Sequence, residues 1–288
     1  MVCCMTMRAG APAPHLLVVG IDGVRYDTLL AAQTPHLDLL AADGVLLPVE
    51  VHARNSTMSG PVWATVATGV YSDRHGVLGN DVHPAELREY PDFLERLRAE
   101  LDDATTMVAA SWFPIAGDHH CGPLFSSRGW LPDVDPETQP DVAAASDAAD
   151  DDVAAYACAR LGQEDVVASF VYFGEPDEFA HHKGTGAGYT ASIERCDARV
   201  GRLLEAISAR ANSGGEAWTV VVVTDHGHVD NGGHGGDSTH ERTAWMAAAG
   251  PGIGPHIGRL CHADIAVQAG KVFGLDFEGL DGVPFGHR

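Results

Sequence analysis

The chain has 288 residues, of which 18 are Lys or Arg and 40 are Asp or Glu, so its formal net charge is −22. This charge argues against a protein that binds nucleic acid polymers or acidic membranes, because those surfaces need clustered Lys and Arg. A hydrophobic fraction of 45% excludes intrinsic disorder. The length suits one large α/β domain with a substantial core.

The ends of the chain and its cysteines bear on its location. Residues 1–14 contain Pro12 and Pro14 and are expected to form a flexible tail before a single domain of residues 15–288. No apolar run approaches the ~20 residues of a membrane helix. The 6 cysteines are scattered and form no Cys-x-x-Cys pair, which is typical of reduced thiols in a cytoplasmic protein. The sequence leaves the oligomeric state open, a homodimer included.

Short apolar runs alternate with helical patterns along the chain. Strands are expected at 15–20, 45–51, 106–110, 166–173, 218–223 and 245–249. Helices are expected at 37–42, 61–68, 92–101, 193–207 and 263–273, and in the fourth of these the apolar residues recur every three or four positions. This alternation predicts an α/β fold with a mainly parallel central sheet and helices on both faces.

Residues 111–152 break the alternation. The segment holds Trp112, Phe113 and Trp130, several prolines and an acidic Ala/Asp run, and it is expected to be an insertion over the sheet edge that acts as a lid. Its aromatic side chains either stack against a flat part of a ligand or pack the insertion onto the sheet.

Residue types that bind metals stand where three of the predicted strands end. They are Asp22 after the first strand, Asp177 and His181 after the fourth, and Asp225 and His226 after the fifth, with His234 in a glycine-rich loop. Each alone has an ordinary reading as a helix cap or a surface residue. Because ligands gather at the carboxyl ends of parallel strands, the joint arrangement predicts a site for two divalent cations. Mixed carboxylate and imidazole ligands favour Zn²⁺, with Mn²⁺ or Mg²⁺ as alternatives.

A hydroxyl stands at the start of the helix predicted at 61–68. The stretch Thr57-Met-Ser-Gly-Pro-Val-Trp63 leads into that helix, so Ser59 lies near the positive end of its dipole and its unpaired N–H groups. Activated by a metal ion, Ser59 could attack a phosphoryl group. The alternative is that Thr57 or Ser59 only caps the helix.

These motifs together resemble the alkaline phosphatase superfamily, and in particular its type I phosphodiesterase/nucleotide pyrophosphatase branch. The resemblance covers about residues 15–285 and implies the three-layer fold of that superfamily. The matching motifs are Gly20-Ile-Asp-Gly23, Ser59-Gly-Pro61, His75-Gly-Val77, Pro176-Asp177 with His181, Thr224-Asp-His-Gly227, Gly233-His-Gly235, Ala249-Gly-Pro-Gly-Ile253 and His262-Ala-Asp-Ile-Ala-Val-Gln268.

The resemblance also implies roles for individual residues. One metal ion would be bound by Asp177, His181 and His234, and the other by Asp22, Asp225, His226 and the Ser59 oxygen. Ser59 would be the nucleophile and form a covalent phosphoserine, while Asn80 would contact a phosphoryl oxygen. The implied activity is the hydrolysis of small-molecule phosphate esters by a phosphodiesterase or nucleotide pyrophosphatase.

The chain departs from the family pattern at three positions, which leaves the substrate class open. It has Ser59 where the diesterase branch usually has Thr, Ala180 before His181 where Gly is usual, and Pro61-Val-Trp63 in place of Pro-Asn-His. A phosphomonoesterase, with Arg74 or Arg128 binding the extra charge, and a phosphonate hydrolase are therefore alternatives. A sulfatase is disfavoured because Pro61-Val-Trp63 lacks the Arg of sulfatases. The alternative from another class is a non-catalytic metal-binding protein.

Overall fold

The computed structural model describes residues 11–83, 87, 89–117, 122–125, 129–210, 213–255 and 257–286. A six-stranded sheet runs through the centre in the order β2-β6-β5-β1-β4-β3. Its strands are β1 (Ala13–Ile21), β2 (Val45–Glu50), β3 (Thr106–Ala110), β4 (Ala168–Phe173), β5 (Glu216–Val223) and β6 (Thr243–Ala249). Strands β5, β1, β4 and β3 are parallel, whereas β6 is antiparallel to both β5 and β2. The predicted, mainly parallel α/β sheet is confirmed.

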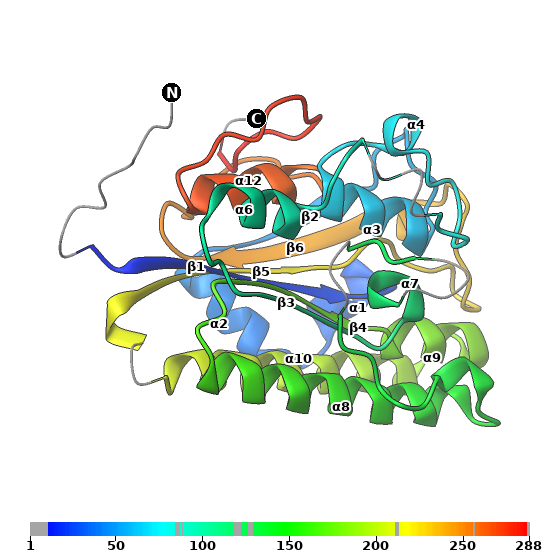
Figure 1. Ribbon diagram of the computed structural model, residues 1–288. Coiled ribbons are helices and arrows are strands. Elements are labelled where there is room, and N and C mark those ends of the chain that lie inside the picture. The colour runs from blue at the N-terminus through cyan, green and yellow to red at the C-terminus, as the bar shows by residue number, and fades with distance from the viewer. Residues whose placement is uncertain are drawn as a thin grey trace.

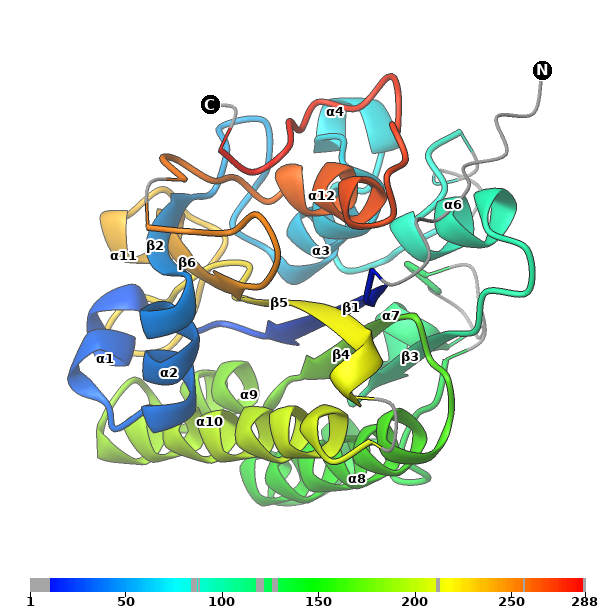
Figure 2. The same cartoon turned by 90° about the vertical axis from the view of Figure 1, so that its left-hand side faces the viewer.

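Helices cover both faces of the sheet (Figures 1 and 2). On one face lie α3 (Ser59–Thr68), α4 (Ser72–His75), α6 (Phe93–Glu100) and α12 (Asp264–Val272). On the other lie α1 (Tyr26–Ala31), α2 (Pro35–Asp43), α8 (Val142–Gln163), α9 (Glu175–Lys183) and α10 (Ala187–Ser208). Two short helices, α7 (Phe113–Ala116) and α11 (Thr239–Arg242), and the 3-10 turns Pro136–Thr138 and Ser213–Gly215 complete the elements. The chain therefore has the expected three layers.

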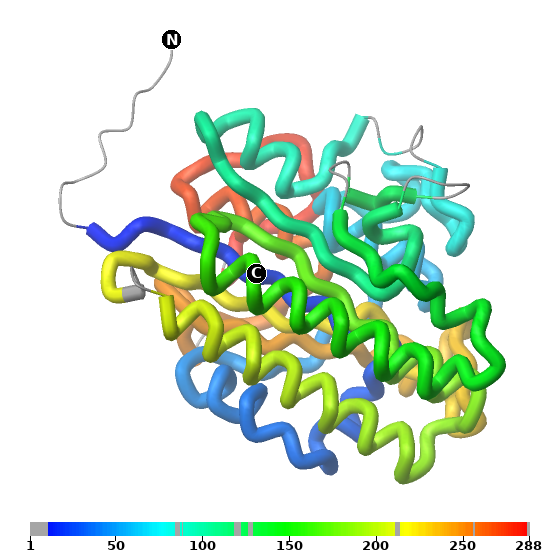
Figure 3. The backbone as a smooth tube through the Cα atoms, turned by 60° about the horizontal axis from the view of Figure 1, so that its bottom comes forward, coloured from blue at the N-terminus to red at the C-terminus, as the bar shows by residue number. Residues whose placement is uncertain are grey.

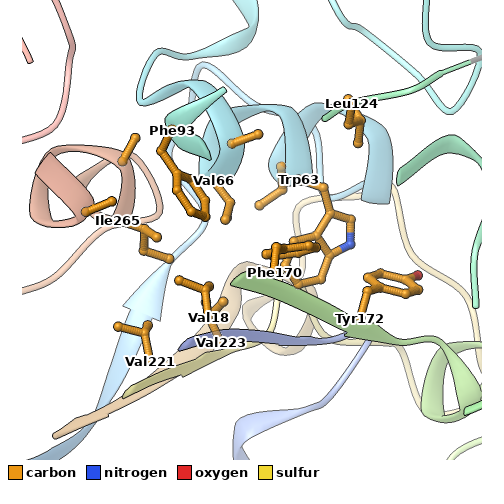
Figure 4. Close-up of a cluster of buried hydrophobic side chains, with 14 of the residues drawn as sticks. Val18, Trp63, Val66, Phe93, Leu124, Phe170, Tyr172, Val221, Val223 and Ile265 are labelled. Atoms are coloured by element: carbon orange, nitrogen blue, oxygen red, sulfur yellow. The ribbon is translucent and has the colours of Figure 1, made fainter. Parts of the chain in front are cut away.

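The side chains of β1 alternate between the two faces of the sheet, and each face packs into its own core. Leu16 and Val18 pack into the core under α3, α6 and α12, while Leu17 and Val19 pack into the core against α2, α8 and α10. Figure 4 shows the first of these cores, in which Trp63 of α3 lies beside Phe170 and Tyr172 of β4. Both faces of β1 are buried, as expected for a central parallel strand.

The expected insertion includes the first half of a long helix. Residues 142–152 form the first turns of α8, which runs side by side with α10 (Figure 3). The helix buries Ala149, Val153 and Ala157 against the sheet. Its alternating Ala and Asp residues give little sequence signal for an apolar face, whereas the folded chain buries a narrow stripe of small side chains. In the described chain, no helix is long and apolar enough to cross a membrane.

Candidate metal centre and active site

The first group of polar side chains lies where β1 and β5 end. Asp22 directly follows β1, Asp225 lies two residues past β5, and the strand register brings both to the same level. His226 Nε2 lies 3.1 Å from Asp225 Oδ2 and 3.8 Å from Asp22 Oδ1. His226 Nδ1 donates to the Gly227 carbonyl oxygen at 3.1 Å, so the Nε2 lone pair faces the two carboxylates. A cation between these side chains would meet a lone pair from each.

The second group is built on α9. Asp177 and His181 lie one turn apart, with Asp177 Oδ2 3.4 Å from His181 Nε2. His234 reaches them from the loop after β5, and its Nε2 lies 2.9 Å from His181 Nε2 and 3.6 Å from Asp177 Oδ1. Two ring nitrogens this close need a proton or a cation between them. The rings of His226 and His234 stack with centroids 3.9 Å apart, so the two groups are adjacent.

Glycine and Thr57 bring His234 into the site. Gly232 has a φ of 77°, and a Cβ there would lie 1.8 Å from the Ala180 carbonyl oxygen, so the loop can approach α9 only with glycine. His234 Nδ1 donates to the Thr57 carbonyl oxygen at 2.7 Å, which directs its Nε2 toward α9. Thr57 Oγ1 donates to the Gly236 carbonyl oxygen at 2.8 Å. The Thr57 hydroxyl thus holds the glycine loop.

Ser59 is the first residue of α3 and faces the first group. Its Oγ lies 3.5 Å from His226 Nε2. Met58 occupies the N-cap position of α3 with an extended backbone, and no side-chain cap bond is made there by a described residue. The structure therefore does not contain the helix cap by Thr57 or Ser59 that was the alternative reading of this hydroxyl.

Asn80 is held against the start of α3. A Cβ on Gly60 would lie 2.2 Å from the Gly79 carbonyl oxygen, so glycine at position 60 allows the two segments to meet. Asn80 Oδ1 accepts a hydrogen bond from the Gly60 N–H at 2.9 Å. Because the N–H can only donate, the amide oxygen is the atom it meets, and the Asn80 NH₂ group remains to donate elsewhere.

Two core side chains hold Asp22. Trp63 Nε1 donates to Asp22 Oδ2 at 2.8 Å, and the Tyr172 hydroxyl donates to the same oxygen at 2.5 Å. Asp22 Oδ1 is thereby turned toward His226. Sequence reasoning missed both donors, although Trp63 stands at one of the positions where the chain departs from the family motif. Figure 4 shows the indole and the phenol side by side above the end of β4.

His228 is a further residue that sequence reasoning missed. It is fully buried, and its Nδ1 accepts the Gly233 N–H at 3.1 Å, so the hydrogen of the neutral ring lies on Nε2. That atom is 2.9 Å from Asp177 Oδ1. Both atoms press against Gly23, where an added Cβ would lie 2.5 Å from His228 Nε2 and 2.6 Å from Asp177 Oδ1. The sequence signal was the second histidine in Asp225-His-Gly-His228.

The site buries three carboxyl groups close together, and their ionised forms need positive charge nearby. Burial, with Asp225 and Asp177 nearby, raises the pKa of Asp22 well above its usual range. Burial also raises the pKa of Asp225 to about 8. Against the effect of burial, hydrogen bonds from His181 and His228 lower the pKa of Asp177. Asp22 Oδ1 and Asp225 Oδ2 are buried without a hydrogen-bond partner in the described chain. These oxygens fit divalent cations, which would offset the charge of three carboxylates.

An ionic network fixes the helix that carries Asp177. Asp150 of α8 accepts the backbone N–H groups of Gly174 at 3.0 Å and Glu175 at 2.9 Å, and so caps the start of α9. The buried Glu175 carboxylate accepts from Arg199 at 2.6 Å and from Arg195 at 2.9 Å, both on α10. Helices α8, α9 and α10 are therefore joined by charged hydrogen bonds directly behind the site.

A cavity of about 720 Å³ opens in front of the two groups. Its walls include Ser59, Asp177 and His234 of the site, with Trp112 and Glu137 from the expected insertion. Of the arginines proposed to bind an extra substrate charge, Arg74 instead donates to Asp281 at 2.9 Å and does not line the cavity. Arg128 lies outside the described residues.

The sequence matches a model of a known family, described as type I phosphodiesterase / nucleotide pyrophosphatase, over residues 16–250. The chain belongs to this family. The expected resemblance to the type I phosphodiesterase/nucleotide pyrophosphatase branch is thereby confirmed as membership of that family.

Curated relatives match over shorter stretches. Human bis(5′-adenosyl)-triphosphatase ENPP4 is 33% identical over 79 residues, which are 27% of this chain and 17% of that protein. Human ectonucleotide pyrophosphatase/phosphodiesterase family member 7 is 38% identical over 82 residues, which are 25% of this chain and 17% of that protein. The matched stretches thus span about a sixth of the relatives' length.

Solved structures share the fold over nearly the whole chain. Murine ectonucleotide pyrophosphatase/phosphodiesterase 5 has a TM-score of 0.66 at 15% identity and covers 93% of this chain and 97% of that one. The phosphonate monoester hydrolase of Agrobacterium radiobacter has a TM-score of 0.67 at 17% identity, covering 94% and 76%. A putative sulfatase from Bacteroides thetaiotaomicron has a TM-score of 0.71 at 14% identity, covering 95% and 74%. At these identities the likeness establishes the fold.

Proposed function

We propose that this chain hydrolyses small-molecule phosphodiesters, with Ser59 as the nucleophile beside two divalent cations. The observation that carries the proposal is the position of Ser59 Oγ, 3.5 Å from His226 Nε2 at the start of α3. One ion would be held by Asp22, Asp225, His226 and the Ser59 oxygen, and the other by Asp177, His181 and His234.

The reaction would proceed through a covalent phosphoserine. Bound cations would polarise the phosphoryl group and stabilise charge on the attacking and departing oxygens. Ser59 Oγ gives its proton to solvent and attacks phosphorus, the bond from phosphorus to the leaving oxygen breaks, and that oxygen takes a proton from solvent to leave as the alcohol. The Asn80 NH₂ group donates to a phosphoryl oxygen as its charge grows. Water then attacks phosphorus and releases Ser59.

The charge of the cavity supports a diester over a monoester. A monoester carries more negative charge than a diester, and proteins usually balance that charge with Arg or Lys. Among the residues that the structure describes, no Lys or Arg lines the cavity. A phosphomonoester and a phosphonate are therefore comparison substrates in the test.

Three finer points belong to the same proposal. Zn²⁺ is the proposed resident ion because imidazole and carboxylate ligands suit it, with Mn²⁺ or Mg²⁺ as alternatives. Nucleotide pyrophosphatase activity is included because the family and ENPP4 are described by such activities. A cytoplasmic location is proposed from the free thiols of Cys158, Cys196 and Cys261.

Substitution of Ser59 tests the proposal. In Ser59→Ala, turnover of bis(4-nitrophenyl) phosphate should fall at least about 10³-fold, while zinc remains bound by the other ligands. Ser59→Thr retains a hydroxyl and should keep measurable turnover and yield a phosphorylated peptide after acid quench. Wild-type turnover in Ser59→Ala would overturn the nucleophile assignment. Zinc binding without turnover of any ester by the wild-type protein would instead indicate a non-catalytic metal-binding protein.

A further inference from the structure

Asp150 of α8 is a fully buried carboxylate that belongs to neither ligand group. Its Oδ1 accepts the backbone N–H of Gly174 at 3.0 Å, and its Oδ2 accepts that of Glu175 at 2.9 Å. Oδ1 also accepts the Ser111 hydroxyl at 2.5 Å. Ser111 directly follows β3 and Gly174 directly follows β4, so one carboxylate joins the ends of two neighbouring strands to α8.

The start of α9 depends on this carboxylate. The first N–H groups of a helix have no carbonyl partner within the helix. Gly174 is the N-cap residue of α9 and has no side chain to accept them, so the acceptor comes from another helix. Asp177 is the third residue of α9 and His181 lies one turn further along, so both side chains move when the start of the helix moves.

The charges around Asp150 divide into two sets of contacts. Arg199 Nη1 lies 3.9 Å from Asp150 Oδ2 and donates to Glu175 at 2.6 Å. The next residue, Asp151, accepts from Arg199 at 3.1 Å and from Arg202 at 3.0 Å, both on α10. In the described chain, Asp151 makes no hydrogen bond to α9. Asp151 therefore joins α8 to α10, whereas Asp150 joins α8 to the helix that carries two of the proposed ligands.

The ligands proposed for the first ion have other supports. Asp22 follows β1 and receives hydrogen bonds from Trp63 and Tyr172, and Asp225 follows β5. Within the part of the chain that the structure describes, Asp150 makes no hydrogen bond or ion pair with any of these four residues. A change at Asp150 thus reaches one ligand group and not the other.

We propose that Asp150 is a positioning residue that sets the affinity of the second ion, the one assigned to Asp177, His181 and His234, and leaves the affinity of the first ion unchanged. This inference rests on the two-ion site of the proposed function. Groups that hold metal ligands in place from outside the ligand set typically contribute about 10–100-fold to metal affinity. Asp150 acts through the backbone of α9, so its effect on two ligands of the same ion is exerted at once.

Zinc affinity, measured on the full chain by competition with a chelator, tests the inference. Asp150→Asn keeps the size of the side chain but leaves one acceptor oxygen for two backbone N–H groups. The variant should bind one zinc ion as tightly as wild type and the other about 10–100-fold more weakly. Equal weakening of both ions, or wild-type affinity for both, would overturn the inference.

Two further variants separate positioning from a general loss of stability. Asp151→Asn is the matched control, because it makes the same change at the next residue of the same network without touching α9, and it should keep both zinc affinities. His181→Ala removes a ligand proposed for the second ion and should retain a single zinc ion. Adding Asp150→Asn to His181→Ala should leave the affinity for that ion unchanged, and a further loss there would show that Asp150 acts on the whole fold.

Ser111→Ala tests the same contact without altering a buried charge. Ser111 Oγ donates to Asp150 and also accepts the Gly174 N–H at 3.1 Å, so its removal loosens the start of α9 while the carboxylate remains. The second zinc ion should bind several-fold more weakly and the first as in wild type. Wild-type affinity for both ions in Ser111→Ala and in Asp150→Asn would refute the positioning role.

Zinc binding separates this inference from the proposed activity, because it needs no turnover. A wild-type protein that binds two zinc ions and hydrolyses no ester would overturn the proposed phosphodiesterase, while selective weakening of one ion in Asp150→Asn would still support the positioning role. Hydrolysis by wild type together with equal weakening of both ions in Asp150→Asn would overturn the positioning role alone. A wild-type protein that binds no second zinc ion would contradict the two-ion site and the positioning role together.

Discussion

Replacing Gly23 by alanine tests whether close backbone contact sets the position of Asp177. The φ of 64° costs an alanine about 1–2 kcal/mol. The added Cβ would lie 2.6 Å from Asp177 Oδ1, and an ordinary contact of 3.4 Å requires a shift of about 0.8 Å (3.4 − 2.6). A displacement near 1 Å at a reacting centre costs about 10²-fold in rate. We expect kcat for bis(4-nitrophenyl) phosphate to fall about 100-fold and the zinc content to decrease.

Gly252→Ala is the matched control. Gly252 has a φ of 80°, and among the described residues no heavy atom lies within 4 Å of the Cβ position. It carries the same backbone strain without the contact, so the midpoint of thermal unfolding should fall by a few degrees in both variants. Gly252→Ala should keep the wild-type kcat and zinc content. If Gly23→Ala retained the kcat of Gly252→Ala, the reasoning from the contact with Asp177 would be refuted.

Two further variants test the electrostatics around Asp22 and Asp225. Trp63→Phe removes the indole donor to Asp22 and should weaken zinc binding about 10–100-fold in a chelator competition, and unchanged affinity would contradict this role. For Asp225, the folded, metal-free pKa of about 8 exceeds the ordinary 3.8, so ionisation destabilises the metal-free fold as pH rises through that interval. Metal-free Asp225→Asn should therefore unfold at a higher temperature than metal-free wild type, by roughly 10 °C at pH 8 and by less toward pH 4. If metal-free wild type unfolded at a higher temperature than metal-free Asp225→Asn at pH 8, this explanation would be excluded.

The strand-end residues could be predicted because each stands beside a local signal. Asp22 directly follows an apolar run, and Asp225 and His226 follow another closely. Parallel strands end at one edge of a sheet, so side chains distant in sequence meet there without any knowledge of the connecting loops. The same rule brought Asp177 and His181 to this edge on α9.

The side chains that hold Asp22 and helix α9 in place could not be predicted, because their contacts cross layers of the fold. Trp63 and Tyr172 resemble ordinary core residues in the sequence, and their bonds to Asp22 depend on how α3 packs over β4. The cap of α9 by Asp150 depends on α8, whose Ala/Asp sequence gives a weak helical pattern. Gly23 could be recognised as a turn residue, whereas the two atoms that require its missing Cβ come from other segments.

The order β5-β1-β4 has a consequence for how such a protein can diversify. The backbones of β1 and β5, after which Asp22 and Asp225 follow, lie one strand spacing apart, about 4.8 Å, which main-chain hydrogen bonding sets irrespective of the side chains around it. The outer wall is formed by the segment that contains Trp112 and Glu137, which belong to none of these three strands. Replacements in that wall can therefore alter which ligand the cavity accepts while the spacing of β1 and β5 stays the same. The ligand preference of the cavity and the residues at the strand ends can change independently in this architecture.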